Sequence, residues 1–161
     1  MRAVRYVRDP RAKAPARHDN SDNNDNMVGI LLLTHAPLGA AFIAAAAHVF
    51  RSMPERLEAI DVRPDQDTAE IGNLARAALA RLDAGQGVLV ITDITGGTPA
   101  NCASPLTQPN LVQVIAGLSL PMLLRALTYR HDVLDVVADM ALAGGQNGAV
   151  TIDNRVRISI N

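Results

Sequence analysis

The sequence has very little of what nucleic-acid binding requires. Phenylalanine, tyrosine and tryptophan together make up 2 % of its 161 residues, so almost no side chain can stack on bases. The formal net charge of −1 provides no basic footprint for a phosphate backbone either. These two absences exclude nucleic acid as the expected partner.

Cysteine is nearly absent too. Cys102 is the only one, which rules out a disulfide scaffold and indicates a small, largely buried thiol in a reducing compartment. Apolar runs end after roughly six to eight residues, whereas a membrane-spanning helix needs about 20. We therefore expect a cytoplasmic protein with no direct membrane insertion.

Three further kinds of site have no signature here. There is neither a Gly-x-Ser-x-Gly elbow for a serine hydrolase nor a Gly-x-x-x-x-Gly-Lys-Ser/Thr loop for nucleotide phosphates. The four histidines have no spacing typical of metal ligands: His18, His35, His48 and His131. We expect neither a metal nor a cofactor.

Residues 1–26 differ in composition from the rest of the chain. Scattered arginines give way to a run of Asp and Asn with no apolar periodicity, which predicts a disordered N-terminal extension. The expected domain covers residues 27–161, and Met27 as the natural start of the protein stays an open alternative.

Within this domain, short apolar runs alternate with segments of helical periodicity. Strands are predicted at 28–33, 57–62, 88–92 and 111–116, and helices at 39–52, 68–82, 99–106, from 121 onward, and at 133–143 with Gly144-Gly145 as the stop. Arg125 and Arg130 are interpreted as solvent-exposed helix charges. The alternation predicts an α/β fold, flavodoxin-like and doubly wound, with a mainly parallel sheet in the order 2-1-3-4 and helices on both faces. Residues 150–160 alternate in polarity and predict an edge strand or hairpin.

Two polar residues stand where neighbouring strands of this sheet end. His35 follows the first strand and Asp93 the third, 58 positions later, so the predicted topology brings them within reach of each other. A carboxylate beside an imidazole fixes one ring tautomer and leaves the other nitrogen free to attack. His35 is the candidate nucleophile and Asp93 its orienting residue, although a histidine at a strand end can also be only a polar loop residue.

The loop after Asp93 has the features of an anion site. Gly96 and Gly97 can turn their backbone N–H groups inward, and Thr98-Pro99 predicts a helix start with Thr98 as the N-cap. A second helix begins near Gly39 at the same crevice. We expect Gly96, Gly97 and Thr98 to bind a phosphoryl group.

Three segments together resemble a known family: residues 29–35, 92–101 and 116–123. They are similar to the IIA component of the mannose/fructose family of the bacterial phosphoenolpyruvate-dependent sugar phosphotransferase system (PTS). The most distinctive is Asp93-Ile94-Thr95-Gly96-Gly97-Thr98-Pro99-Ala100-Asn101. The resemblance covers roughly residues 27–148.

This resemblance implies a phosphotransferase, a cytoplasmic homodimer that takes a phosphoryl group from the phosphocarrier protein HPr and passes it to a IIB component. The active-site histidine corresponds to His35 and the orienting aspartate to Asp93, and Thr34 and Ser119 are expected to support these residues without binding the phosphoryl group. Family members commonly have Asn where this chain has Ser119. The C-terminal strand is expected to pair across the dimer as an antiparallel edge strand, and the IIB acceptor is expected to be a separate protein.

Two other functions stay open at this point. The chain could be a regulatory phosphocarrier without a transport role, because a IIA component never touches the sugar and the sequence assigns none. It could also be a non-enzymatic flavodoxin-like module that binds a small anion, such as a receiver phosphorylated on aspartate. A receiver usually has an acidic pair after its first strand, where this chain has Thr34-His35.

Overall fold

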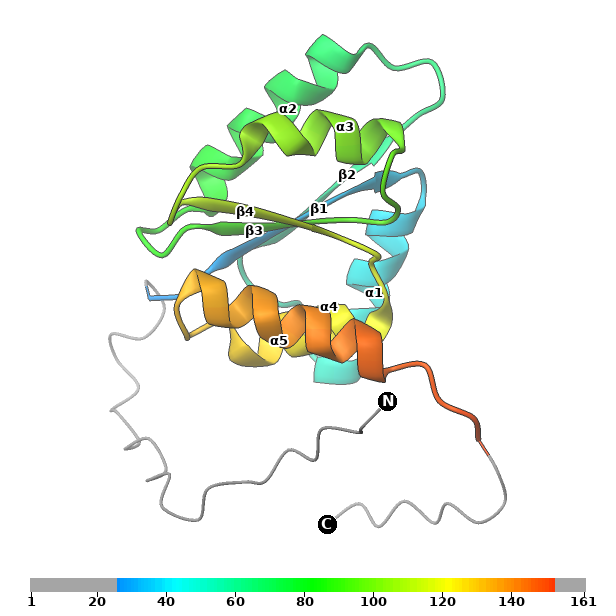
Figure 1. Ribbon diagram of the computed structural model, residues 1–161, viewed down its shortest axis with the longest axis vertical. Helices are drawn as coiled ribbons and strands as arrows, with labels where there is room; N and C mark the ends of the chain where they lie inside the picture. Colours follow the sequence, from blue (N-terminus) through cyan, green and yellow to red (C-terminus); the bar gives the residue numbers. More distant parts are fainter. Residues whose placement is uncertain (1–25, 153–161) are drawn as a thin grey trace, which may run out of the picture.

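Four parallel strands form the centre of the molecule. The structure is a computed structural model that describes residues 26–152. Its strands are β1 (Gly29–His35), β2 (Leu57–Val62), β3 (Val88–Thr92) and β4 (Val112–Ala116). They pair in the order β2-β1-β3-β4, and every pair is parallel. The predicted order is confirmed, and Figure 1 shows the sheet crossing the middle of the molecule.

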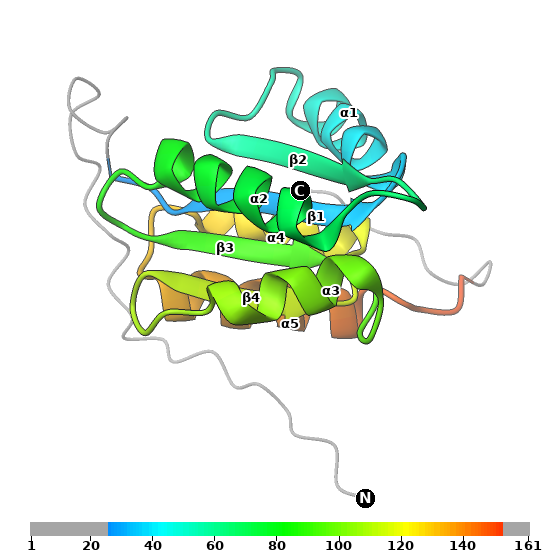
Figure 2. The same ribbon diagram turned by 90° about the horizontal axis from the view of Figure 1, so that it is seen from above.

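Helices cover both faces of this sheet. Figures 1 and 2 show α1 (Leu38–Phe50), α4 (Leu120–Tyr129) and α5 (Leu134–Asn147) on one face, and α2 (Thr68–Leu82) and α3 (Thr98–Ala103) on the other. Alternate residues of β1 enter the two layers: Ile30 packs in the core beneath α4 and α5, and Leu31 in the core beneath α2. Both are fully buried, as expected for a strand covered on two sides. The doubly wound α/β fold is confirmed.

Two predicted helix boundaries need correction. Gly144 and Gly145 do not stop α5, which continues to Asn147. A Cβ on Gly144 would lie 2.6 Å from Arg125 Cγ and 2.7 Å from the Pro121 carbonyl oxygen, so this glycine lets α5 approach α4 closely. The predicted helix 99–106 is α3 followed by a 3₁₀ turn, η1 (Ser104–Leu106). Pro105 lies in that turn and has no N–H to continue an α-helix.

The predictions for the chain ends are not tested by this structure. Val150 and Ile152 are exposed and not assigned to a strand, and the rest of the predicted strand 150–160 lies outside the described residues. Residues 1–25 of the predicted extension 1–26 also lie outside them. In the part of the chain that is described, no helix is long and apolar enough to cross a membrane. That same part brings together no group of three or more His, Cys, Asp or Glu suited to a metal ion.

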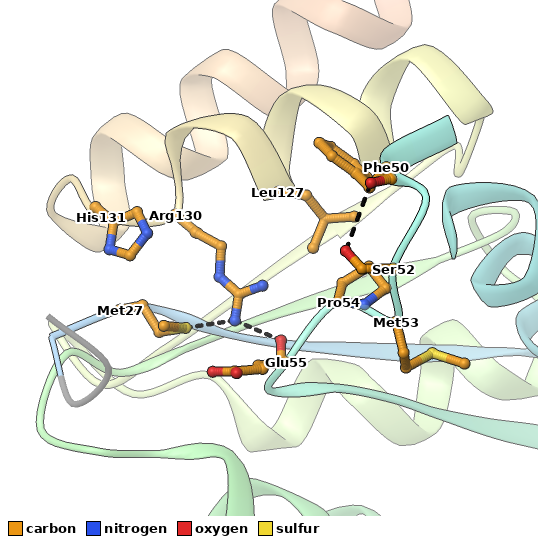
Figure 3. Close-up of a pocket in the computed structure, with 9 residues that line it drawn as sticks. All are labelled: Met27, Phe50, Ser52, Met53, Pro54, Glu55, Leu127, Arg130 and His131. Carbon is orange, nitrogen blue, oxygen red and sulfur yellow. Dashed lines mark hydrogen bonds between the residues drawn. The ribbon is translucent and has the colours of Figure 1, made fainter. Parts of the chain in front are cut away.

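Arg130 is buried, contrary to its interpretation as a solvated charge. Only 7 % of this residue is exposed, because it packs against the end of the sheet at which β1 begins. Its guanidinium donates to the Glu55 carbonyl oxygen and contacts Met27 Sδ, and its own carbonyl accepts from Val28 N at 2.8 Å. Figure 3 shows it beside a cavity of about 330 Å³ between the α1 end, the segment before β2, and α4. Burial lowers the pKa of the guanidinium, although nearby Glu55 offsets part of this effect.

Arg130→Met should lower the free energy of unfolding by about 1–3 kcal/mol, because a buried side chain loses its part-buried hydrogen bond to the Glu55 carbonyl. The matched control is Arg125→Met on α4, where the lost guanidinium is exposed and contacts only the hydroxyl and the ring of Tyr129 among the interactions of the described residues. We expect the control to change stability by no more than about 0.5 kcal/mol. Urea unfolding measures both variants, and equal losses would contradict a structural role specific to Arg130.

Candidate active site

His35 and Asp93 emerge at the edge of the sheet where the parallel strands end. The first six residues of β1 are buried and His35, its last residue, is exposed. Asp93 directly follows β3, and the two strands are neighbours with Leu33 opposite Thr92. Between these strands the chain order of the sheet reverses, which is where ligands bind in open α/β sheets.

The two side chains are in direct contact. His35 Nδ1 lies 2.8 Å from Asp93 Oδ2, and the same oxygen accepts from the His35 backbone N at 3.1 Å. The other carboxylate oxygen accepts from Ile94 N at 3.0 Å. The side chain of His35 is 47 % exposed and that of Asp93 only 10 %. The predicted juxtaposition is confirmed, and the catalytic roles of the pair stay a prediction.

The charge on Asp93 determines which nitrogen of His35 carries the proton. Burial alone would raise the pKa of Asp93, but the hydrogen bonds and charge of His35, together with a bond to the backbone at Asp93, lower it below its ordinary value. The ionised carboxylate can only accept hydrogen bonds, so Nδ1 carries the proton and donates. When the ring is neutral, Nε2 is therefore the nitrogen with a free lone pair.

Gly97 provides the space beside that nitrogen. A Cβ built on this residue would lie 2.8 Å from His35 Cε1 and 3.4 Å from Nε2. Every other residue would therefore crowd the ring at its free edge. Gly97 is in an extended conformation, so the requirement for glycine here is one of space rather than of backbone geometry.

The remaining predicted phosphate-binding residues line the same loop. Gly96 has φ = 78°, a conformation that favours glycine, and its carbonyl accepts from Asn101 Nδ2 at 3.3 Å. Thr98 is exposed and is the first residue of α3, whereas Gly97 is the N-cap. The prediction of Thr98 as N-cap is wrong by one position because the chain already turns at Gly97. The structure places Gly97 against the His35 ring, with Gly96 and Thr98 as its neighbours in the chain, and phosphoryl binding by the three residues stays a prediction.

Thr34 and Ser119 both have structural partners. The buried Thr34 hydroxyl donates to Asp61 Oδ1 at 3.1 Å. Ser119 is the N-cap of α4, and its hydroxyl accepts from Met122 N at 3.4 Å. Ser119 therefore has a role that an Asn could also fill, since both residues favour N-caps.

Asp61 is the residue that the sequence analysis missed. Its carboxylate accepts from Gly39 N at 2.7 Å and Ala40 N at 3.2 Å, so it occupies the N-terminus of α1. Two N–H groups of the helix end predicted near Gly39 are therefore already bonded within the protein. Asp61 stands opposite Thr34 in the β1–β2 register, and the predicted strand order contained the signal that would have revealed it.

Replacing the histidine should change the titration of Asp93. In His35→Ala the carboxyl stays partly buried but loses the ring hydrogen bond and charge, so its pKa should rise above the wild-type value. Because the folded-state pKa is lowered in the wild type, Asp93 stabilises the fold above its ordinary pKa, and this contribution disappears as the pH falls through the lowered value. NMR titration of the Asp93 carboxyl carbon measures the difference, and identical titration curves would contradict this account.

Two solved structures with the same fold are proteins of the phosphotransferase system. The mannose/sorbose-specific IIA subunit of the phosphotransferase system from Enterococcus faecalis superposes with a TM-score of 0.69 at 25 % identity, covering 79 % of this chain and 96 % of that one. The phosphotransferase system component EIIA from Streptococcus agalactiae gives a TM-score of 0.69 at 22 % identity, covering 78 % and 97 %. The second likeness, at this low identity, shows the fold alone.

Sequence relatives lead to the same group. Residues 29–143 match the model of the family described as the PTS system fructose IIA component. The mannose-specific EIIAB component of Escherichia coli K12 is 31 % identical over 124 residues, which cover 75 % of this chain but only 38 % of that protein. The sorbose-specific EIIA component of Lacticaseibacillus casei is 31 % identical over 107 residues, covering 65 % of this chain and 75 % of that protein. The chain therefore belongs to the mannose/fructose family of IIA components of the bacterial sugar phosphotransferase system.

Proposed function

We propose that this protein is a phosphohistidine carrier of the sugar phosphotransferase system, a phosphotransferase that accepts a phosphoryl group from HPr on His35 and passes it to a IIB component. The observation that carries the proposal is the state of the imidazole. Asp93 holds Nδ1 at 2.8 Å, and Nε2 is left free on a side chain that is 47 % exposed. A nucleophile at an exposed sheet edge can reach a phosphoryl group held by another protein.

The chemistry follows from this arrangement. The Nε2 lone pair attacks the phosphorus of the donor's phosphohistidine, a new N–P bond forms, and the bonding electrons of the old one return to the donor imidazole. His35 keeps its proton on Nδ1, so its ring becomes positively charged. The Asp93 carboxylate faces that N–H and stabilises the charge. Transfer to the IIB component is the same reaction with phosphorylated His35 as the donor: a group of the IIB component attacks the phosphorus, and the electrons of the N–P bond return to the His35 ring.

The transferring group needs hydrogen-bond donors on the Nε2 side. The backbone N–H groups of Gly97 and Thr98 and the Thr98 hydroxyl are proposed to supply them, with Gly96 shaping the loop. The N-terminus of α1 is not available because the Asp61 carboxylate already binds its N–H groups. No metal is required, since the donor is itself a reactive phosphohistidine and positioning supplies the rest.

The surroundings of His35 suit a protein partner. Leu38 is 40 % exposed and Ile94 is 58 % exposed, and the two follow His35 and Asp93 closely in the chain. Exposed apolar side chains around a polar reactive group are typical of the centre of a protein–protein interface. We place the protein in the cytoplasm, where HPr and IIB would meet it, and propose that it is a homodimer.

His35→Ala should abolish labelling by phosphoenolpyruvate, enzyme I and HPr, because no other group takes over the role of Nε2. His48→Ala, which removes an exposed histidine of α1, is the matched control and should label fully. The label on the wild type should be lost in acid and survive alkali, as a phosphohistidine does. Full labelling of His35→Ala, or an alkali-labile acyl phosphate, would refute the proposal and favour a receiver-like module.

Gly97→Ala should slow phosphoryl transfer by roughly tenfold or more, because the added Cβ would displace the ring, and a shift of about 1 Å in a reacting group can cost 10²-fold. Gly72→Ala is the control: it lies on α2, and a Cβ there meets nothing closer than the end of Arg76 at 3.5 Å. Quench-flow measurement of HPr-dependent labelling compares the two. Equal rates would show that the free edge of His35 is not where the phosphoryl group arrives.

A further inference from the structure

One carboxylate holds both ends of the loop that carries His35. Asp61 Oδ1 accepts from the Thr34 hydroxyl at 3.1 Å, directly before His35 in the chain. The same oxygen accepts from Gly39 N at 2.7 Å, and Oδ2 accepts from Ala40 N at 3.2 Å. Residues 35–38 therefore lie between two segments that are bound to the same side chain.

The contact depends on an unusual closeness of the two segments. A Cβ on Gly39 would lie 2.8 Å from Asp61 Oδ1 and 3.0 Å from Thr34 Oγ1, so only glycine permits this approach. Thr34 itself is fully buried. A buried hydroxyl and two helix N–H groups that share one carboxylate form a local network with few alternative arrangements.

Asp61 and Asp93 act from opposite sides of β1. Asp93, after β3, binds the backbone and ring of His35, whereas Asp61, on β2, binds the loop before and after it. Asp93 holds His35 itself, and the loop after it is bonded to β2 through Ala36 N, which donates to the Val62 carbonyl at 3.0 Å. Asp61 adds side-chain bonds on both sides of this loop, at Thr34 before it and at Gly39 and Ala40 after it.

We propose that Asp61 is a positioning residue for phosphoryl transfer: it acts through Thr34, Gly39 and Ala40 to fix the His35 loop, and touches neither the phosphoryl group nor the partner protein. The activity part of this inference rests on the proposed phosphocarrier function. It assigns a role in transfer to a carboxylate on β2, a strand that contributes no group to the reacting atoms.

The test compares Asp61→Asn with Asp65→Asn. The first keeps the size of the side chain but replaces one acceptor oxygen with an NH₂ group, which cannot accept from the α1 N–H groups. The second makes the same charge change at an exposed residue of the turn after β2. We expect Asp61→Asn to lower the maximal rate of labelling by HPr by about 10- to 100-fold, with the half-saturating HPr concentration unchanged. Asp65→Asn should stay within about twofold of wild type.

A second measurement needs no phosphoryl donor. The Nδ1 proton of His35 is shielded by Asp93, and its exchange with solvent, followed by NMR, should become faster in Asp61→Asn and stay unchanged in Asp65→Asn. If the role of Asp61 were purely structural, Asp61→Asn would lower the melting temperature. It would not lower the maximal rate selectively while leaving the half-saturating HPr concentration unchanged. If the wild-type protein is not labelled at all, the proposed function is wrong. The proton-exchange measurement still tests whether Asp61 holds the His35 loop in place.

Thr34→Val is the second variant if Asp61→Asn does not fold. It keeps the charge of Asp61 and both helix hydrogen bonds and removes only the Thr34 hydroxyl. Loss of one such bond should lower the maximal rate by about two- to tenfold. The inference is overturned if a folded Asp61→Asn or, failing that, Thr34→Val shows wild-type rates and wild-type proton exchange, or if its rate falls only through weaker binding of HPr.

Discussion

The parallel pairing of β1 with β2 on one side and β3 on the other is the constraint on which the site depends. It places Thr34 opposite Asp61 and Leu33 opposite Thr92, so each neighbouring strand delivers a carboxylate near the end of β1. A shift of one residue in either register would turn these side chains to the opposite face of the sheet. The apolar residues of β1, buried on both faces, hold that register because a shift would exchange their environments.

The site is defined by missing side chains as much as by those present. Gly39 allows the α1 N-terminus to reach Asp61, and Gly97 leaves the free edge of the His35 ring open. The two carboxylates restrain the loop and the ring, and the two glycines supply the space. A rigid nucleophile with an open approach is what transfer between two large proteins requires, because neither partner can adapt much around the other's reacting group.

Much of this arrangement was accessible from the sequence, for identifiable physical reasons. The strands are short apolar runs bounded by turn residues, and their alternation with helices leaves few possible topologies. The expected topology was enough to predict that His35 and Asp93 lie close together. Asp61 was missed because a carboxylate in a half-buried strand has no local signature, and its partners are 21 to 27 positions away. Arg130 and the Gly144-Gly145 pair were misread for a similar reason. An arginine near a helix end usually faces solvent and a glycine pair usually ends a helix, and only tertiary packing reverses both rules here.

The buried Arg130 also has a consequence for the way the protein is made. Arg130 and Met27 are 103 positions apart in the chain, and Met27 lies two residues before β1. β1 therefore leaves the ribosome early, but the contacts of Met27 and Val28 before it can form only after Arg130, which follows α4, has been synthesised. Contacts of such long separation are formed late, because the entropy of closing the loop must be overcome first. Although the histidine, both carboxylates and the glycine loop all precede residue 100, the contacts that close the other end of β1 form only after most of the domain has emerged.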